Sequence, residues 1–389
     1  MGWLAGARDL AFDPMKSRCL CGVWAVLLSV TGCGSDEARK FSNSGGSAGS
    51  SSGGSAGSSS GGSAGSSSGG NAGSSSGGTA GSGSGGTAGA NTGGTGATGT
   101  GGAAPTPTVV TPAVYAESLV EVAGTLYWTE AGTNPDYKDS KVRKFTAAGG
   151  ATDLATAPEG RFLRLVHSNG ALIWANYGTI TGPQGTVESI KTDGSGQKSL
   201  ATKVSTATGI ALIGSKIYFT RNSTSGEVVE IDGTNVTPVF TNQSQPDAIA
   251  AAGSTLYWGN YDKPGALMKG APGAVASPIA ALDYITAIEA TAADLFVAHD
   301  GGVSKLNLNG VGSVILSDKQ VNDIAVNATH LYLTSGDGNV VVRAKLDGSE
   351  RTELVTSAPG QPKGLALTPT TLYWTEYAGL GRIMRLDVK

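Results

Sequence analysis

The sequence predicts an all-β protein built as a seven-bladed β-propeller, and two observations support this prediction. A short apolar-aromatic triplet recurs seven times, about every 40 residues. Each copy lies among short β-prone stretches that are separated by turn residues. One such repeat forms a single four-stranded sheet, which cannot bury both of its faces without neighbouring copies. The triplets are Leu126-Tyr127-Trp128, Leu172-Ile173-Trp174, Ile217-Tyr218-Phe219, Leu256-Tyr257-Trp258, Leu295-Phe296-Val297, Leu331-Tyr332-Leu333 and Leu372-Tyr373-Trp374.

The first 32 residues have the pattern of a secretory signal peptide. Lys16 and Arg18 form a basic segment, and a short apolar stretch follows at residues 19–30. This stretch is too short to cross the hydrocarbon of a membrane. Because acidic residues precede the basic segment, we expect the true start to be Met15; a longer natural leader is the alternative.

The signal segment ends in Leu27-Leu28-Ser29-Val30-Thr31-Gly32-Cys33. This stretch resembles the lipobox of bacterial lipoproteins, in which the Cys becomes the lipidated first residue of the mature protein. The resemblance implies a cell-envelope lipoprotein that is attached to a membrane through palmitate and related lipid on Cys33. We expect the outer membrane, with the protein on its periplasmic or exposed side. Ordinary cleavage that leaves a free thiol is the alternative.

A low-complexity tether is predicted between the lipidated Cys33 and residue 104. Its composition changes abruptly to Gly, Ser, Ala and Thr, which cannot bury enough apolar surface to order the chain. All three cysteines lie within the first 33 residues, so the segment that follows forms no disulfide and no thiolate metal site. The folded domain is therefore expected at residues 105–389, and its stability must come from its core.

The strands of one blade can be assigned within the repeat at residues 247–279. An inner strand is expected at 248–252, a second at 255–258, a third at 266–269 and a fourth at 275–279. Asp-Gly or Asn-Gly pairs supply the positive φ angles that tight turns between the third and fourth strands need. These pairs are Asp193-Gly194, Asp232-Gly233, Asn309-Gly310 and Asp347-Gly348. The aspartates lack the spacing of a calcium-binding loop, so we interpret them as turn residues.

The two ends of the folded domain are expected to share a blade. The last repeat stops at Asp387 without a fourth strand, and a β-prone stretch at 106–116 precedes the first inner strand. We predict that this stretch supplies the missing strand and closes the ring. Seven triplets then give seven blades, and a six-bladed ring with one additional hairpin is the alternative.

Two propeller families resemble this repeat. Leu126-Tyr127-Trp128-Thr129-Glu130 and Leu372-Tyr373-Trp374-Thr375-Glu376 resemble the motif of YWTD propellers, and the likeness continues through residues 381–387. That family usually has six blades, and the final Asp of its motif is replaced here in every repeat. The chain is also similar to seven-bladed bacterial propellers of the streptogramin lyase type. This second resemblance implies metal-dependent lyase chemistry with His and Glu near the channel, and no residue of this chain matches those groups one by one.

Two rings of varied residues are expected on one side of the propeller, because the first strand of each blade runs opposite to the second. One ring lies two residues after each triplet, and the other lies nine residues before it. The first ring is Glu130, Asn176, Arg221, Asn260, His299, Ser335 and Glu376. The second is Glu117, Leu163, Thr208, Asp247, Thr286, Asn322 and Lys363, where the second blade departs from the pattern and has Arg161 and Arg164 nearby.

Variation at one structural position is typical of a binding site, because a purely structural role favours one repeated residue type. A mixed set of acidic, basic and amide groups suits a small polar or zwitterionic ligand or a peptide segment. The alternative is that these groups cap strand ends and bond to neighbouring blades. The ligand-binding candidates are Glu117, Glu130, Asn176, Arg221, Asp247, Asn260, His299, Asn322, Lys363 and Glu376.

A binding module is favoured over an enzyme, and we expect the propeller to bind an envelope protein, a peptide or a small polar ligand through its channel-mouth face. The sequence has no nucleophile motif, and we assign no catalytic residue, metal ligand or cofactor. The alternatives are a metal-dependent lyase or hydrolase at the same face, with His299 and carboxylates as ligands, and a domain with only a structural display role. The formal net charge is −3 and no basic patch is visible, which excludes nucleic acid as an expected partner.

Overall fold

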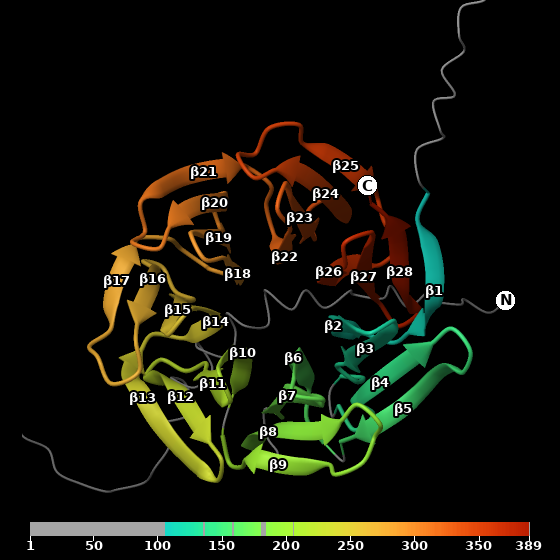
Figure 1. The fold of residues 1–389 in the computed structure, drawn as a ribbon, viewed down its shortest axis with the longest axis horizontal. Coiled ribbons are helices and arrows are strands. Elements are labelled where there is room, and N and C mark those ends of the chain that lie inside the picture. Colours follow the sequence, from blue (N-terminus) through green and yellow to red (C-terminus); the bar gives the residue numbers. More distant parts are fainter. Residues whose placement is uncertain (1–105, 135–136, 158, 180–183, 205, 389) are drawn as a thin grey trace, which may run out of the picture. The chain divides into compact units, whose positions relative to one another are not determined.

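The computed structural model describes residues 106–388, apart from 135–136, 158, 180–183 and 205. Within these residues all regular structure is β, arranged as seven four-stranded antiparallel sheets around a central axis (Figure 1). No helix in the described part is long and apolar enough to cross a membrane. The predicted seven-bladed propeller is confirmed, and the six-bladed alternative is wrong. The predictions for the signal peptide, Cys33 and the tether lie outside the described residues.

Each blade contains four strands. In blades one to six they follow one another outward from the axis in chain order, and in blade seven the outermost strand is β1. The innermost strands of blades one to seven are β2 (Ala116–Val122), β6 (Phe162–Ser168), β10 (Ala207–Ile213), β14 (Pro246–Ala252), β18 (Ala287–Ala290), β22 (Val321–Val326) and β26 (Gln361–Leu367). The second strands are β3 (Thr125–Glu130), β7 (Ala171–Gly178), β11 (Lys216–Arg221), β15 (Thr255–Asn260), β19 (Asp294–His299), β23 (His330–Ser335) and β27 (Thr371–Tyr377).

The third strands are β4 (Lys141–Thr146), β8 (Gln184–Lys191), β12 (Gly226–Asp232), β16 (Ala266–Gly270), β20 (Gly302–Asn307), β24 (Val340–Lys345) and β28 (Gly381–Asp387). The outermost strands are β5 (Gly150–Thr156), β9 (Lys198–Ala201), β13 (Asn235–Gln243), β17 (Ser277–Ala280), β21 (Gly312–Leu316), β25 (Thr352–Val355) and, for blade seven, β1 (Thr108–Ala113). The four strands expected in the repeat at 247–279 match β14 to β17 to within about two residues.

Strand β1 closes the ring. It pairs antiparallel with β28, with Thr108 opposite Arg385 and Ala113 opposite Gly381. Blade seven therefore combines the first described strand of the chain with the last three, as Figure 1 shows. The predicted closure is confirmed: backbone pairing of β1 with β28 joins the two ends of the domain.

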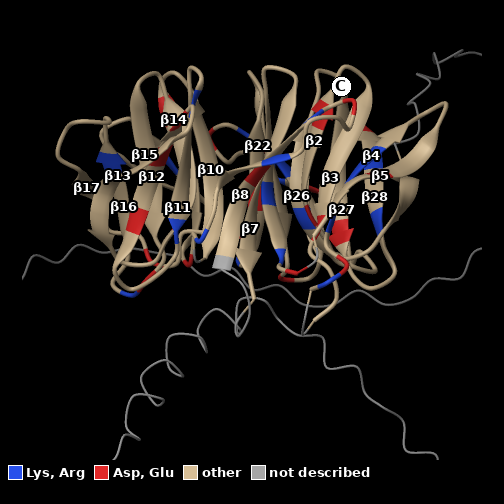
Figure 2. Ribbon diagram, turned by 90° about the horizontal axis from the view of Figure 1, so that it is seen from below, with Lys and Arg blue, Asp and Glu red and all other residues tan. Residues whose placement is uncertain are grey.

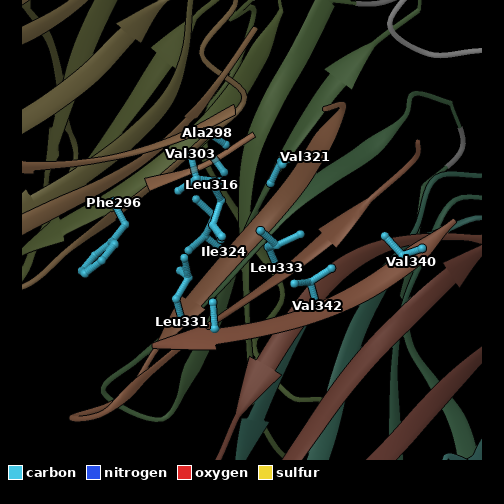
Figure 3. Close-up of a cluster of buried hydrophobic side chains, with 12 residues drawn as sticks. Phe296, Ala298, Val303, Leu316, Val321, Ile324, Leu331, Leu333, Val340 and Val342 are labelled. Carbon is cyan, nitrogen blue, oxygen red and sulfur yellow. The ribbon is translucent and has the colours of Figure 1, made fainter. Parts of the chain in front are cut away.

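The core lies between the blades. In the cluster of Figure 3, Phe296 and Val303 of blade five pack with Leu331 and Val342 of blade six. The four tryptophans of the triplets are completely buried: Trp128, Trp174, Trp258 and Trp374. Trp258 stacks on Phe240 of blade three, with 4.7 Å between the ring centroids. The triplets thus supply the large apolar area that joins each sheet to its neighbours.

A threonine directly after some triplets forms a second link between blades. The hydroxyl of Thr129 donates to the carbonyl of Leu163 in blade two (2.7 Å). In blade three, the hydroxyl of Thr220 donates to the carbonyl of Asp247 in blade four (2.7 Å) and accepts the N–H of Gly209 in its own blade (2.9 Å). The residue that follows the aromatic pair therefore satisfies backbone groups of two adjacent inner strands.

The turns between third and fourth strands have the predicted backbone. Gly194, Gly233, Gly310 and Gly348 have φ angles of 92°, 62°, 82° and 84°, a region that favours glycine. The Asp347 carboxylate accepts the N–H of Ser349 at 2.9 Å, as in an Asx turn. This geometry is consistent with our interpretation of the aspartates in these pairs as turn residues.

Candidate functional site

One end of the ring, which we call the mouth, is where the inner strands begin and the second strands end. Strand pairing places the two predicted rings there together. Ala116, beside Glu117, lies opposite Glu130, and Pro246, beside Asp247, lies opposite Asn260. Figure 2 shows acidic and basic residues together near β22 and β26. The predicted placement of both rings at one end is confirmed, whereas their contact with a ligand stays a prediction.

The inner ring lies on β-bulges. The register shifts at the start of β2, β6, β10, β14, β22 and β26, at the positions of Glu117, Leu163, Thr208, Asp247, Asn322 and Lys363. A bulge changes the direction of a side chain and interrupts the ladder locally. The bulges therefore turn the side chains of the inner ring toward the axis at the level of the mouth. Asn322 donates to the carbonyl of Pro362 in the next blade (2.8 Å).

The two glutamates of the outer ring are held inside their own blades. Buried Glu130 accepts hydrogen bonds from Trp128 Nε1 (3.0 Å) and Arg143 Nη1 (3.2 Å). Glu376 is also buried and accepts one from Arg382 Nε at 2.9 Å. These contacts satisfy the charge of each carboxylate and fix the end of its strand.

The remaining outer-ring candidates also make contacts within the fold. Asn176 accepts a backbone N–H two residues farther along the chain (3.0 Å). Arg221 forms an ion pair with Glu227, and Asn260 donates to Gln243 Oε1 at 3.5 Å. Because these side chains join neighbouring segments, their geometry is that of capping groups at strand ends.

His299 is buried and both of its ring nitrogens are engaged. Nδ1 accepts the N–H of Gly301 (3.0 Å), so Nε2 carries the proton and donates to the hydroxyl of Ser304 (2.8 Å). Burial lowers its pKa, and the positive charge of Lys319 acts in the same direction. In this arrangement the imidazole has no lone pair left for a metal ion.

A first charged group at the mouth, the mouth cluster, consists of Glu117, Arg161, Lys363 and Tyr377 from blades one, two and seven. Glu117 forms ion pairs with Arg161 and with Lys363, whose Nζ lies 2.7 Å from Oε2. Lys363 Nζ also lies 4.1 Å from the centroid of the Tyr377 ring. Burial alone raises the pKa of Glu117, but the two cations lower it to about 2. The buried Nε of Arg161 has no hydrogen-bond partner in the described part of the chain.

A second group, the channel cluster, consists of Arg164, Glu289 and Asp323. Arg164 Nη1 lies 3.1 Å from Asp323 Oδ1. This ion pair joins blade two to blade six across the ring. Asp323 also accepts the N–H groups of Ile324 (3.1 Å) and Leu365 (3.0 Å). Burial raises the pKa of Glu289 to about 7; Arg164 opposes this shift and Asp323 adds to it.

The channel cluster borders a cavity of about 320 Å³. Its walls are parts of β2, β6, β18, β22 and β26. Arg164 and Asp323 lie toward the mouth ends of β6 and β22, and His167 and Val326 line the cavity farther along the same two strands. Apart from Arg164, His167, Glu289 and Asp323, most of the lining is aliphatic. A cavity of this size and character is typical of a small-molecule site.

Sequence reasoning missed the channel cluster as a site, although a signal was present. The position that pairs with the second triplet residue is occupied by Val120, Val166, Ala211, Ala250, Glu289, Ala325 and Ala366. One blade therefore has a carboxylate where the other six have a small apolar side chain. Arg164 and Asp323 likewise stand in a ring where other blades have Ser, Gly or Ala.

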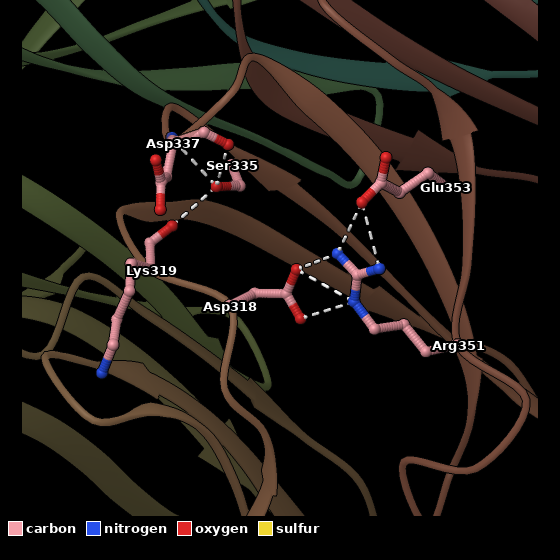
Figure 4. Close-up of polar contacts among 6 residues, drawn as sticks. All are labelled: Asp318, Lys319, Ser335, Asp337, Arg351 and Glu353. Carbon is pink, nitrogen blue, oxygen red and sulfur yellow. Dashed lines mark hydrogen bonds and ion pairs between the residues drawn. The ribbon is translucent and has the colours of Figure 1, made fainter.

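A larger cavity of about 480 Å³ lies at the edge of blade six (Figure 4). Arg351 bridges Asp318 (2.6 Å) and Glu353 (3.1 Å), and the hydroxyl of Ser335 donates to the carbonyl of Lys319 (2.6 Å). These groups satisfy one another and tie the loop before β22 to the loop before β25. We therefore regard the channel, and not this cavity, as the candidate site.

Comparisons with known proteins identify the fold. Streptogramin B lyase matches with a TM-score of 0.59 and 14% identity, over 73% of this chain and 98% of that chain. The chain shares its propeller fold with streptogramin B lyase. A catalytically inactive histidine-to-alanine variant of virginiamycin B lyase from Staphylococcus aureus, with quinupristin, matches with a TM-score of 0.58 and 15% identity over 72% and 96% of the two chains.

A nidogen/laminin complex gives a weaker match, with a TM-score of 0.47 and 18% identity, over 66% of this chain and 97% of that one. No family model and no curated protein matches the sequence. At these identities the matches to the two lyases establish the propeller fold and leave the activity open.

The metal ion that the lyase resemblance implies does not fit the described mouth residues. His299 uses both nitrogens, and Glu130 and Glu376 are held by arginines. Glu117 is held by two cations. No three His, Cys, Asp or Glu side chains come together as a metal site among the described residues. The donor set needed for metal-dependent lyase chemistry is therefore missing from this part of the chain.

Proposed function

We propose that this chain is a bacterial cell-envelope lipoprotein whose propeller binds a zwitterionic small molecule or a peptide segment at the mouth. The lipobox-like segment supports attachment through Cys33, and the Gly/Ser-rich tether would hold the propeller away from the outer membrane. The propeller fold supports a binding role because it brings side chains from several blades to one end of a central cavity.

The observation that carries the proposal is the opposite charge of the two clusters. In the mouth cluster, Arg161 and Lys363 face the single carboxylate of Glu117. Around Arg164 the ratio is reversed, because this guanidinium interacts with Asp323, Glu289 and Asp247. A ligand with one anionic and one cationic group would complement both clusters. Nucleic acid, which is a uniform polyanion, would not.

Binding of a panel of dipeptides, free amino acids and envelope peptides to the full chain tests the proposal. We expect a member of the panel to bind, and Arg161→Met to weaken that binding at least about tenfold, because it removes a cation that faces the ligand's anionic group. A tenfold change corresponds to about 1.4 kcal/mol. Arg385→Met is the matched control, because Arg385 is an exposed residue on β28 that pairs with Asp387. The proposal fails if nothing in the panel binds, or if Arg161→Met binds as tightly as Arg385→Met.

The same experiment separates the alternatives. A purely structural display domain predicts no saturable binding at the mouth. A lyase or hydrolase predicts that a bound compound is converted, which mass spectrometry of the incubated panel would detect. A capping role for the outer ring is supported by the contacts of six of its residues: Glu130, Asn176, Arg221, Asn260, His299 and Glu376. The proposal therefore places the ligand nearer the axis.

A further inference from the structure

Glu289 stands out in the channel because the fold does not require a carboxylate there. In the six other blades, Val or Ala occupies the equivalent place on the innermost strand, opposite the second triplet residue. The blades therefore assemble with a small apolar side chain at this level. A charged residue in one blade alone points to a role outside the folding of the ring.

The carboxylate of Glu289 accepts no hydrogen bond and forms no ion pair with any described residue. It is half-buried and faces the cavity. Its neighbour Asp323 differs, since Arg164 and two backbone N–H groups satisfy it. A carboxylate removed from water without a partner is unfavourable. Glu289 thus has hydrogen-bonding capacity that the protein itself leaves unused.

The charge around the cavity favours a cation. Among the described residues that line the cavity, Arg164 from β6 is the only one with a guanidinium. It interacts with Asp323 from β22, Glu289 from β18 and Asp247 from β14. A ligand cation beside Glu289 would balance this excess of carboxylates. His167 on β6 lies in the same wall.

The walls indicate which kind of cation fits. The apolar lining consists of Leu, Val, Ile and Ala, and the described lining includes no Phe, Tyr or Trp ring. Quaternary ammonium groups are recognised by aromatic cages, which are missing here. A primary ammonium donates three N–H bonds and can use an unpartnered carboxylate directly, and an aliphatic wall suits a short methylene chain.

We propose that the channel cavity binds the primary ammonium group of a ligand with a short aliphatic body, and that Glu289 accepts its hydrogen bonds. A lysine side chain or a free aminoalkyl compound has this chemistry. The inference rests on the proposed function and adds the orientation of the ligand: its ammonium group lies in the channel and its anionic group lies toward the mouth cluster.

Calorimetric titration of the full chain with three matched probes tests this inference: n-pentylamine, n-pentanol and pentanoate. At pH 8 we expect saturable binding of n-pentylamine and none of the other two. Glu289→Gln is expected to weaken amine binding at least tenfold, and Glu350→Gln, at an exposed position on the loop before β25, is expected to leave it unchanged. Binding of the amine is expected to weaken at pH 5.5, because Glu289 is then protonated while Arg164 keeps its charge.

Three results would overturn the inference. Equal binding of n-pentanol and n-pentylamine would show an apolar cavity without cation recognition. Unchanged amine binding in Glu289→Gln, which thermal unfolding would show to be folded, would place the amine elsewhere. A ligand from the dipeptide and amino acid panel that depends on Arg161 but binds equally well to Glu289→Gln would refute the amine site and leave the proposed function standing. If neither the panel nor the probes bind, both proposals fail.

Discussion

Replacement of Glu289 by Gln should stabilise the propeller at neutral pH. In the wild-type chain the carboxyl group lies in the channel without a hydrogen-bond partner among the described residues. Burial raises its pKa to about 7, from an ordinary value of 4.5. Gln has nearly the same size and cannot ionise, so the substitution removes the charge while it keeps the packing against β22.

The sign and size follow from the difference between the folded and unfolded states. Below about pH 4.5 the carboxyl group is protonated in both states, and the substitution has little effect. Between about pH 4.5 and 7 the unfolded chain loses the proton first, so the free energy of unfolding of the wild type falls as the pH rises. Each pKa unit corresponds to about 1.4 kcal/mol, which gives an upper limit of roughly 3 kcal/mol above pH 7. Because Glu289 is only half-buried, solvent screens its charge, and we expect about 1–3 kcal/mol.

Urea denaturation and thermal unfolding between pH 4.5 and 8 measure the effect. For a domain of this size about 1 kcal/mol corresponds to roughly 2–4 °C in Tm. The difference between Glu289→Gln and wild type should grow across this range and level off above pH 7. Glu350→Gln, at an exposed position, should show no such growth. A constant difference at every pH, or a variant that is less stable at pH 8, would refute the assignment of an unpartnered carboxylate to the channel.

Three further predictions concern the mouth and the blade contacts. Lys363→Met should destabilise the chain by about 3 kcal/mol, because it removes one partner of a buried ion pair. The wild type should lose stability as the pH falls from about 4.5 to 2, where Glu117 becomes protonated. The variant should lose less stability over this range, and acid denaturation of both proteins would measure the difference. Thr220→Val should cost about 1 kcal/mol by loss of its bonds to blade four and to its own bulge, whereas exposed Thr237→Val should not change the urea midpoint. Treatment of the full chain with EDTA should change its Tm by less than about 1 °C, because only removal of a bound metal ion would lower the stability of the fold. A larger fall in Tm would contradict our interpretation that the mouth residues do not form a metal site.

The repeat could be predicted because its signals are local. Hydrophobic alternation, an aromatic pair and an Asp-Gly turn lie within one blade, and each depends on neighbouring residues. The missing fourth strand after Leu386 also predicted the closing role of β1, since a sheet edge needs a partner. The common end of the two rings followed from the antiparallel direction of adjacent strands.

The channel cluster could not be predicted in the same way. The contact between Arg164 and Asp323 joins blades on opposite sides of the axis, so it depends on the width of the ring and on the bulges that aim both side chains. The sequence does not contain these bulges as a visible pattern. Conversely, the sequence suggested the outer ring as a binding site because its residues differ from blade to blade. In the structure Glu130 and Glu376 are capping groups at strand ends, and each is held by an arginine of its own blade.

The pairing of β1 with β28 makes the order of synthesis important. Of the 28 strands in the described part of the chain, β1 is synthesised first and its partner β28 last, so blade seven is the last of these sheets that can be completed. Until then β1 has an unpaired edge, and blade one has an uncovered face toward the gap. Closure of the ring is therefore expected to be a late step of folding, because a ring that closed around an incomplete set of blades would have to open again before β28 could dock.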